Sequence, residues 1–514
     1  MKVYSVDEIR FVEEKEDEIG TRFIRLMENA GAASAKRIEK YLKGKYDTDI
    51  TIVCGRGKNG GDGYVIARKL HESGYSVKVV LAQGAPAAND AVEMFHKITQ
   101  MDIAIYRYDR EQTACEKAIE EADLLVDCIF GIGFHGEPDI PCSEVFQLMN
   151  FASAPIIAID VPSGVNSDTG EAAEIAICAD KTYAITTLKP AHVLLPSREY
   201  CGDIEVLKIG ISDEALSTVS PRLETLEKDE IPYLILDRPL DCHKNDFGHV
   251  LVIAGSRNMP GAACLSSGAA VVSGAGLTTV AFPESAYASL ASGSKEIMLL
   301  PLPDIDGKLA ATVECISSLH TYMEKATAIV IGPGIGQSPD VTEVVFDVIR
   351  NANCPLVIDA DAINAISTDL SILKEAKSEI IITPHPGEMS RLTGLTVAEI
   401  EENREGLASD FAKRHNITVL LKGAATVVAS HLTDKIYINC TGSPALAKGG
   451  SGDVLSGIIG AMLASHHDPY ESAKLGAFMH GYAAEIASRE TGIASMKASD
   501  LYTGIQKAYL SFDR

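Results

Sequence analysis

Residues 445–461 read ALAKGGSGDVLSGIIGA, and the expected fold follows from this stretch outward. Small residues at 449–452 lead into Asp453, after which an apolar run begins. A glycine-rich turn that enters a helix presents free backbone N–H groups and the positive end of the helix dipole to an anion. A carboxylate at such a turn repels phosphate, but it has a purpose if it takes a proton from a hydroxyl that attacks a phosphoryl group. The alternative is an ordinary turn in which Asp453 caps the helix.

The size and composition indicate a globular protein of more than one domain. A chain of 514 residues is too long for a single core, so two or three domains are expected. With 71 acidic against 46 basic residues, the net charge of −25 argues against nucleic acids and anionic membranes as partners. No apolar run of about 18 residues suggests a membrane span. The eleven cysteines form no CxxC pair, which favours a reducing compartment, and we expect a cytoplasmic protein.

The first half of the chain alternates strands and helices. The expected elements are a helix at 21–43, a strand at 47–55, a loop at 55–63, a helix at 64–74 and a strand at 75–82. This order is a βαβ unit, which predicts a parallel sheet with ligands at the carboxyl ends of the strands. Asn59 and Asp62 in the loop offer oxygen ligands for a cation or partners for ribose hydroxyls. Asp62 is alternatively a simple helix cap.

Two further strands of the first half end in aspartate. Asp127 ends a strand before a glycine-rich loop, and Asp160 ends another before a turn that contains Ser163. Any one such aspartate is more often a turn or cap residue than a catalyst. Polar residues at three strand ends of one sheet, at Asn59, Asp127 and Asp160, instead favour a shared site.

A polar, acidic stretch at 212–247 separates the halves, and we place the boundary near 220–235. Beyond it the chain predicts a second α/β domain with a mainly parallel sheet. Its expected strands are 249–256, 276–283, 326–336, 354–362, 379–388 and 417–430.

Three strand ends of the second half carry residues suited to a nucleotide site. The segment at 332–336, GPGIG, is a turn lined by backbone. His385 lies between two prolines that fix its backbone, although a lone histidine there is usually structural. Lys422 precedes a turn of small residues, where a β-phosphate or an adenosine group has room to bind.

The motifs KNGGDGYVIAR, VDCIFGIGFHG and AIDVPSGVNSDTG resemble the N-terminal epimerase domain of the bifunctional NAD(P)H-hydrate repair enzymes. The resemblance spans about the first two-fifths of the chain and implies a Rossmann-like fold. It implies that Asp160 is catalytic. Family members often carry Asn where this chain has Lys58, which leaves the role of Lys58 open. The residues that the resemblance places around the hydrated nucleotide are Asn59, Gly60, Gly61, Asp62, Gly63, Gly131, Ile132, Gly133, Phe134, His135, Gly136, Glu137 and Asp160.

The same resemblance implies potassium held by Asn59, Asp127 and Ser163. These residues offer one amide oxygen, one carboxylate and one hydroxyl, with a single formal charge. A divalent ion usually draws more carboxylates, so a large monovalent ion suits the set better. The alternative is that all three side chains only satisfy turn backbones.

The motifs GSRNMPGAA, GPGIG, ITPHPGEMSRLTG, LLKGAAT and ALAKGGSGD resemble the ribokinase-like dehydratase domain of the same enzymes. Ser451 stands where threonine is usual, and Asn245 where glycine is frequent. The resemblance implies that Asp453 activates the C6 hydroxyl of the hydrate to attack the terminal phosphate of ADP or ATP, with magnesium. It places the hydrated nucleotide against Ala262, Gly334, His385 and Asp453. It places the adenine nucleotide against Lys422, Gly423, Ala424, Ala425, Thr426 and Gly452.

The sequence therefore predicts an α/β protein with a Rossmann-like epimerase domain at 1–220 and a ribokinase-like dehydratase domain at 228–514. The expected function is repair of hydrated NADH and NADPH (NADHX and NADPHX), with ADP or ATP as co-substrate. We expect a homo-oligomer that has neither nucleic-acid nor membrane partners. One alternative is a vitamin or sugar kinase with a Rossmann-like regulatory domain, which leaves Asn59, Asp127 and Ser163 without a role. Another is a non-catalytic nucleotide sensor, but the candidate catalytic residues Asp160 and Asp453 argue against it.

Overall fold

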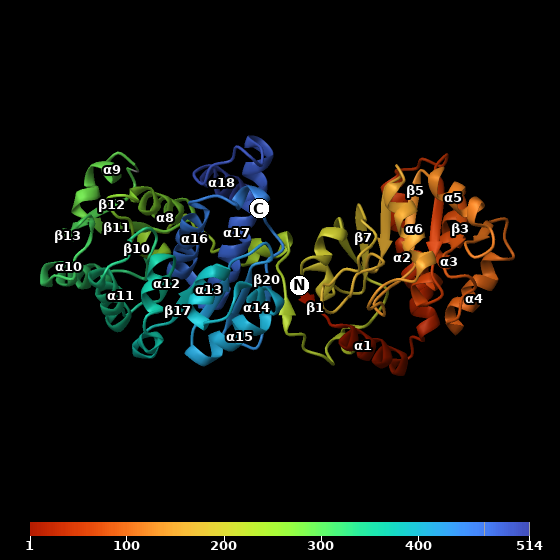
Figure 1. Cartoon of the computed structure of the whole chain (residues 1–514), viewed down its shortest axis with the longest axis horizontal. Coiled ribbons are helices and arrows are strands. Elements are labelled where there is room, and N and C mark those ends of the chain that lie inside the picture. Colours follow the sequence, from red (N-terminus) through yellow and green to blue (C-terminus); the bar gives the residue numbers. More distant parts are fainter. Residues whose placement is uncertain (294, 467, 513–514) are drawn as a thin grey trace. The chain divides into compact units, whose positions relative to one another are not determined.

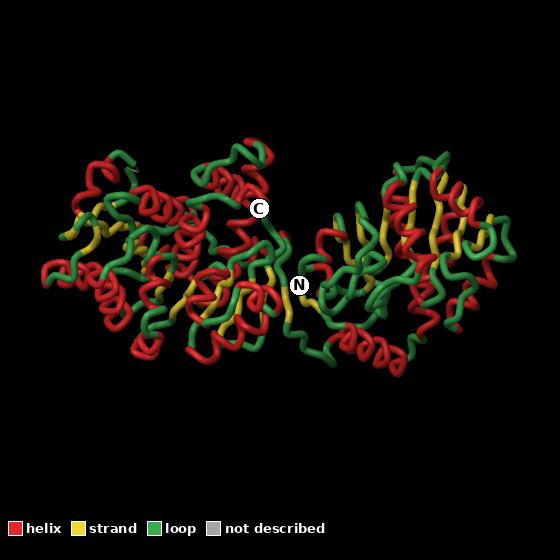
Figure 2. Tube along the Cα trace, in the orientation of Figure 1, coloured by secondary structure: helices red, strands yellow, loops and turns green. Residues whose placement is uncertain are grey.

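The computed structural model describes residues 1–293, 295–466 and 468–512. The chain divides into two compact units, Met1–Leu223 (unit 1) and Glu224–Arg514 (unit 2). In each unit strands alternate with helices along the chain (Figures 1 and 2). Among the described residues, no helix combines the length and the apolar character that crossing a membrane requires.

Unit 1 is built on a parallel sheet with the strand order β4-β3-β2-β5-β6-β7-β8. The chain order reverses between β2 and β5, and such a switch point opens a crevice at the carboxyl ends of the two strands. Cys54 and Cys128 stand opposite each other at these ends. The strands are β2 (Asp49–Cys54), β3 (Ser76–Leu81), β4 (Ala104–Arg107), β5 (Leu124–Cys128), β6 (Ile156–Ile159), β7 (Lys181–Ile185) and β8 (Asp203–Leu207).

Helices cover both faces of this sheet because successive side chains of a strand point to opposite faces. On β2, Ile52 packs into a core with α2, α3 and α4, whereas Val53 packs into a core with α5 and α6. The helices are α1 (Val6–Ile19), α2 (Phe23–Leu42), α3 (Lys58–Glu72), α4 (Asn89–Ile98), α5 (Gln112–Glu120), α6 (Ile140–Phe151) and α7 (Asp213–Leu216).

The prediction of a loop at 55–63 is wrong from Lys58 onward, because α3 begins at that residue. The glycines that favoured a loop instead let the helix approach the strands closely. A Cβ on Gly60 would stand 2.1 Å from the carbonyl oxygen of Gly55, and one on Gly63 would stand 2.6 Å from the sulfur of Cys54. Glycine is required where backbone meets backbone at such distances.

Unit 2 contains the strands β20-β19-β18-β17-β16-β15-β10-β11-β12 side by side. The pairs from β18 to β12 are parallel, and β19 runs antiparallel to both neighbours. The single strand expected at 417–430 is therefore a hairpin, since the small residues after Lys422 form a turn. The strands are β10 (His249–Ile253), β11 (Leu277–Pro283), β12 (Met298–Leu302), β15 (Ala328–Ile331), β16 (Leu356–Ile358), β17 (Ile380–Ile382), β18 (Thr418–Leu421), β19 (Val427–Ser430) and β20 (Ile436–Ile438).

Helix α16 (Ser451–His466) lies between the sheet and an outer helical layer. Ile459 packs with the strands, whereas Ile458 packs with α17 and α18. Gly457 permits a close approach to α8, because a Cβ there would stand 2.0 Å from the carbonyl oxygen of Ser266. The other helices are α8 (Pro260–Val272), α9 (Tyr287–Ala291), α10 (Val313–Met323), α11 (Pro339–Asn351), α12 (Asp361–Ile366), α13 (Pro386–Thr393), α14 (Val397–Glu402), α15 (Arg404–His415), α17 (Pro469–Thr491) and α18 (Asp500–Phe512).

Candidate active sites

A cavity of about 620 Å³ lies in unit 1, next to the start of α3 and the loops that follow β5 and β6. Most of the residues expected around the hydrated nucleotide line it. Gly60, Gly61, Gly63 and Gly136 are not among the lining residues. The expected residues that do line it are Asn59, Asp62, Gly131, Ile132, Gly133, Phe134, His135, Glu137 and Asp160.

Asp160 lies in the cavity wall with its backbone in the left-handed region, at φ 71°. The backbone N–H of Ile185 donates to its Oδ1 at 3.1 Å, and the ammonium group of Lys189 pairs with the same oxygen. Lys189 is only 1% exposed. Lys189 and Asp160 therefore form a buried ion pair at the cavity wall.

His192 connects these two residues through their backbones. Its Nδ1 accepts a hydrogen bond from the N–H of Lys189 at 2.9 Å, so the ring proton is on Nε2, which donates to the carbonyl oxygen of Asp160 at 2.8 Å. Burial, assisted by the charge of Lys189, lowers the pKa of His192 to about 3. The ring is therefore neutral, and it fixes the backbone on both sides of the ion pair.

Two further carboxyl groups, Asp62 and Glu13, line the same cavity. Loss of hydration, and then the negative charge of Asp160, raises the pKa of Asp62 well above its usual value. The pKa of Glu13 is also raised, mainly by burial. The cavity thus combines a carboxylate that is ion-paired with Lys189 and carboxyl groups that hold protons more tightly than usual, and such a combination suits acid–base chemistry.

Asn59, Asp127 and Ser163 lie close together beside the cavity. The amide nitrogen of Asn59 donates to the carbonyl oxygens of Phe130, at 2.7 Å, and Ile159, at 3.1 Å. Its Oδ1 is buried and has no hydrogen-bond partner among the described residues. Ser163 donates to Asp127 through its hydroxyl at 2.6 Å and its backbone N–H at 2.7 Å. Burial raises the pKa of Asp127 to about 6.

In unit 2, Asp453 lies in the first turn of α16, as expected, and faces the end of β18. Gly452 lies next to Lys422, since a Cβ there would be in van der Waals contact with its Nζ at 3.6 Å. Burial, and then the charge of Asp359, raises the pKa of Asp453 to about 7, although Lys422 acts in the opposite direction. A carboxylate with this pKa is suited to accept a proton near neutral pH.

Lys422 is held by two carboxylates. Its Nζ lies 2.9 Å from Oδ1 of Asp359 and 3.6 Å from Oε2 of Glu388. The hydroxyl of Thr383 donates to the same oxygen of Asp359 at 2.7 Å. Burial disfavours the ammonium form, but the two carboxylates outweigh that effect, so the pKa of Lys422 lies above its usual value.

The other expected contacts of the hydrated nucleotide lie around this centre. Gly334 has φ 63°, and a Cβ there would stand 2.7 Å from Cβ of Ala262. His385 caps α13, since its Nδ1 accepts from the N–H groups of Gly387 at 3.0 Å and Glu388 at 3.3 Å. Burial lowers the pKa of His385, so the ring is neutral.

The expected adenine-nucleotide contacts at 423–426 form the β18–β19 turn. The hydroxyl of Thr426 donates to the carbonyl oxygen of Gly423 at 3.0 Å. The guanidinium group of Arg404 donates to the carbonyl oxygens of Leu421 and Lys422, both at 3.1 Å, and so fixes the backbone where the turn begins. Ala424 and Ala425 complete the turn.

Sequence reasoning missed several residues of both sites. Asp359 was recognisable, because it ends a buried strand in the same manner as Asp127. Glu388 and Arg404 have no such signal, and neither do Arg10 and Glu13, which reach the cavity of unit 1 from α1.

Known families match both halves of the chain. The family described as YjeF-related protein N-terminus matches residues 24–191, and the family described as NAD(P)H-hydrate dehydratase matches residues 250–507. A bifunctional NAD(P)H-hydrate repair enzyme from Moorella thermoacetica is 37% identical over 489 residues, covering 93% of this chain and 91% of the relative. The chain belongs to the family of bifunctional NAD(P)H-hydrate repair enzymes.

A second curated relative supports this assignment, and a solved structure is similar to part of the chain. The bifunctional NAD(P)H-hydrate repair enzyme of Escherichia coli is 32% identical over 509 residues, which cover 98% of this chain and 93% of the relative. A crystal structure of an ADP/ATP-dependent NAD(P)H-hydrate dehydratase from Bacillus subtilis, co-crystallised with ATP/Mg2+, matches 56% of this chain and 98% of that one, with 30% identity and a TM-score of 0.48. The predicted family, α/β fold class and enzymatic function are confirmed.

Proposed function

We propose that the two units of this bifunctional repair enzyme divide the repair of hydrated NADH and NADPH between them. Unit 1, expected as the domain at 1–220, interconverts the R and S hydrates. Unit 2, expected as the domain at 228–514, dehydrates the S hydrate with ADP or ATP. The observation that carries the proposal is Asp453, a carboxylate with a pKa near 7 in the first turn of a buried helix, beside the cation Lys422.

In unit 2, Asp453 takes the proton from the C6 hydroxyl of the hydrate while the oxygen of that hydroxyl bonds to the terminal phosphorus of the nucleotide. The bond from that phosphorus to the bridging oxygen breaks, and AMP leaves if the nucleotide is ADP. The electron pair of ring N1 then expels phosphate from C6, and loss of a proton from C5 restores NADH. Lys422 and the backbone of the glycine-rich turn stabilise the negative charge of the transferred group.

In this proposal the nucleotide binds as its magnesium complex. Magnesium commonly binds substrate phosphates and retains its waters, so it needs few protein ligands. That requirement fits the site, because Asp359 and Glu388, the carboxylates beside Lys422, are both engaged by the lysine. Bound magnesium would supply positive charge to the phosphates.

In unit 1, epimerisation at C6 requires the hydroxyl to leave and water to return on the other face of the ring. The N1 electron pair breaks the C6–O bond while a proton passes to the leaving oxygen, and the incoming water then loses a proton. We propose that Asp160 accepts this second proton, because its carboxylate lies in the cavity wall and is held there by Lys189 and by the N–H of Ile185.

Potassium fits the residues that the resemblance assigns to it. The buried Oδ1 of Asn59 has no hydrogen-bond partner among the described residues and is free to coordinate a cation. The backbone of Phe130 hydrogen-bonds to both Asn59 and Ser163, and Ser163 in turn donates to Asp127, so the three side chains lie in one cluster. In the described ranges, no three His, Cys, Asp or Glu side chains gather as a metal-binding group, which agrees with an ion of low charge. Bound potassium would supply positive charge next to the cavity.

A homo-oligomeric state and a cytoplasmic location remain part of the proposal.

The test uses the full-length protein. S-hydrated NADH with ADP should regain the absorbance of NADH and release one phosphate per NADH formed. The R hydrate should convert to the S hydrate without any nucleotide, as followed by NMR. Accumulation of a phosphorylated product without NADH would instead support the vitamin or sugar kinase alternative.

A further inference from the structure

The lining of the unit 1 cavity is unfavourable for an anionic ligand, and the residues discussed above do not offset this. The hydrated nucleotide carries a pyrophosphate with two negative charges, yet carboxyl groups outnumber lysine and arginine side chains in the lining. The raised pKa values of Asp62 and Glu13 and the pairing of Asp160 with Lys189 reduce the negative charge, but Asp90, Glu137 and Asp139 also line the cavity. Like charges disfavour binding unless local cations or backbone N–H groups offset them. The six carboxyl groups that line the cavity belong to Glu13, Asp62, Asp90, Glu137, Asp139 and Asp160.

Among the described lining residues, the lysine and the arginine are Lys58 and Arg10. Both are exposed, so they stand at the rim where a ligand enters rather than in the closed wall. They come from different elements, Arg10 from α1 and Lys58 from the first position of α3. Two cations on separate elements are able to contact one anion from two sides.

The ammonium group of Lys58 is held by an aromatic ring and interacts with Glu13 and Asp62 only at longer range. Its Nζ lies 4.6 Å from the ring centroid of Phe23, a cation–π contact that leaves N–H groups available. It has no carboxylate within ion-pair distance in the part of the chain that the structure describes. Gly57, the N-cap of α3, provides no side-chain cap, so the first N–H groups of the helix add to the positive potential beside Lys58.

Arg10 is similarly available. Its ion pair with Asp7 spans 3.8 Å, and the side chain of Asp7 is 94% exposed, so the pair is weak. Nη2 of Arg10 would lie 3.8 Å from a Cβ at Gly133, which places the guanidinium group against the backbone of the glycine-rich loop. A guanidinium group beside backbone N–H groups suits phosphate recognition.

We propose that Arg10 and Lys58 bind the pyrophosphate of the hydrated nucleotide at the rim of the unit 1 cavity, an inference that rests on the epimerase function proposed above. The pyrophosphate is common to hydrated NADH and hydrated NADPH, so both substrates need this contact. The assignment gives a role to Lys58, which the sequence alone left open. Helix α1 then contributes directly to substrate binding.

The experiment measures R-to-S conversion by the full-length protein without ADP, using Lys58→Asn, Arg10→Gln and the double variant. Each hydrogen bond to a charged group is modest at an exposed rim, so each single variant should raise KM about 3- to 10-fold, with kcat retained. The double variant should raise it further. Inorganic pyrophosphate should inhibit the wild type and inhibit the double variant less.

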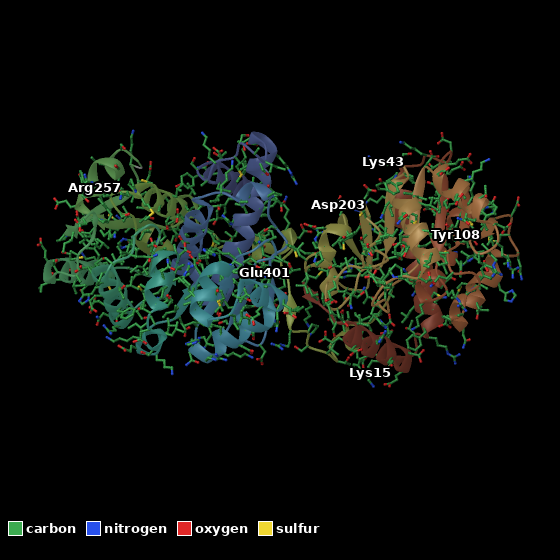
Figure 3. All side chains as sticks on the ribbon, in the orientation of Figure 1. Lys15, Lys43, Tyr108, Asp203, Arg257 and Glu401 are labelled. Atoms are coloured by element: carbon green, nitrogen blue, oxygen red, sulfur yellow. The ribbon has the colours of Figure 1, made fainter. Side chains whose placement is uncertain are left out.

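The controls remove the same charge from the same helices outside the cavity. They are Lys15→Gln on α1, labelled in Figure 3, and Lys69→Asn on α3. Both should leave KM unchanged, and dehydration of the S hydrate should be unchanged in every variant.

Three results would overturn the proposal. One is an unchanged KM in the double variant, and another is an equal change in the controls. The third is an effect confined to hydrated NADPH, which would assign the cations to its extra 2′-phosphate. If the wild type converts the R hydrate no faster than buffer does, the epimerase function itself fails, and this outcome is distinct from the other three.

Discussion

Nζ of Lys422 lies 2.9 Å from Oδ1 of Asp359, and the two members of this ion pair shift the pKa of Asp453 in opposite directions. Burial is the main cause of the raised pKa of Asp453, the charge of Asp359 raises it further, and Lys422 lowers it. The proton affinity of the base is therefore adjusted by charges at two strand ends, those of β16 and β18, in addition to its own burial.

Asp453→Asn should abolish dehydration of the S hydrate and leave R-to-S conversion intact, because only unit 2 uses this base. Removal of a general base typically lowers the rate by about 10²- to 10⁴-fold. The measurement is the recovery of NADH absorbance with ADP, beside NMR of the hydrates without it. Dehydration at the wild-type rate would rule out the proposed role.

Dehydration should rise with pH through about 7. The pKa of Asp453 is raised to about 7, and the group acts as a base only after losing its proton, so activity falls as the pH drops below that value. The measurement is kcat/KM for the S hydrate between about pH 5 and 9.

Asp359→Asn should shift the acidic limb of the pH profile, the fall in dehydration activity on the acid side, to lower pH. The substitution removes a charge that raises the pKa of Asp453, and it leaves Lys422 to lower that pKa. Asp434→Asn, at a side chain that is 83% exposed, is the control and should not move the limb. A shift of the limb to higher pH in Asp359→Asn would contradict the assignment.

Lys189→Met should destabilise unit 1 and slow R-to-S conversion. Removal of one member of a buried ion pair leaves the other charge uncompensated, which typically costs about 3–5 kcal/mol. Adding Asp160→Asn should recover part of the stability but not the activity, since Asn tolerates a positive φ and carries no charge. Urea unfolding followed by circular dichroism measures the stability, because the chain contains no Trp. Equal stability losses in the single and double variants would argue against the pair.

Substrate affinity in unit 1 should depend on potassium and weaken in Asp127→Ala. The test compares the KM for the R hydrate in potassium buffer and in tetramethylammonium buffer, for the wild type and the variant. Asp123→Ala is the matched control, since Asp123 precedes the opposite end of β5. Equal KM values under all conditions would mean that Asn59, Asp127 and Ser163 are structural.

The sequence predicted those features that are local to one strand end. A buried strand that ends in a polar residue is visible along the chain, and it located Asp127, Asp160 and the turn before Asp453. The start of α3 was not predicted, because the glycines at 60–63 read as a loop until the packing against Gly55 and Cys54 is known.

Residues that reach a site from a distant element were not assigned a role. Lys189 pairs with Asp160 across 29 positions, and Arg10 and Glu13 arrive from a helix that precedes the recognisable motifs. Nothing in the local sequence distinguishes them from surface residues, because only the tertiary fold brings them to the cavity. The same limitation concealed Glu388 and Arg404 in unit 2.

The hydrogen bonds of His192 fix the backbone behind Asp160 without adding a charge there. Its Nδ1 accepts from the amide of Lys189, its Nε2–H donates to the carbonyl oxygen of Asp160, and burial lowers its pKa to about 3, so the ring is neutral near neutral pH. A histidine next to a candidate catalytic residue normally suggests a pH sensor. Here it acts as a neutral spacer that positions Asp160 and Lys189 and takes no part in the acid–base chemistry of R-to-S conversion near neutral pH.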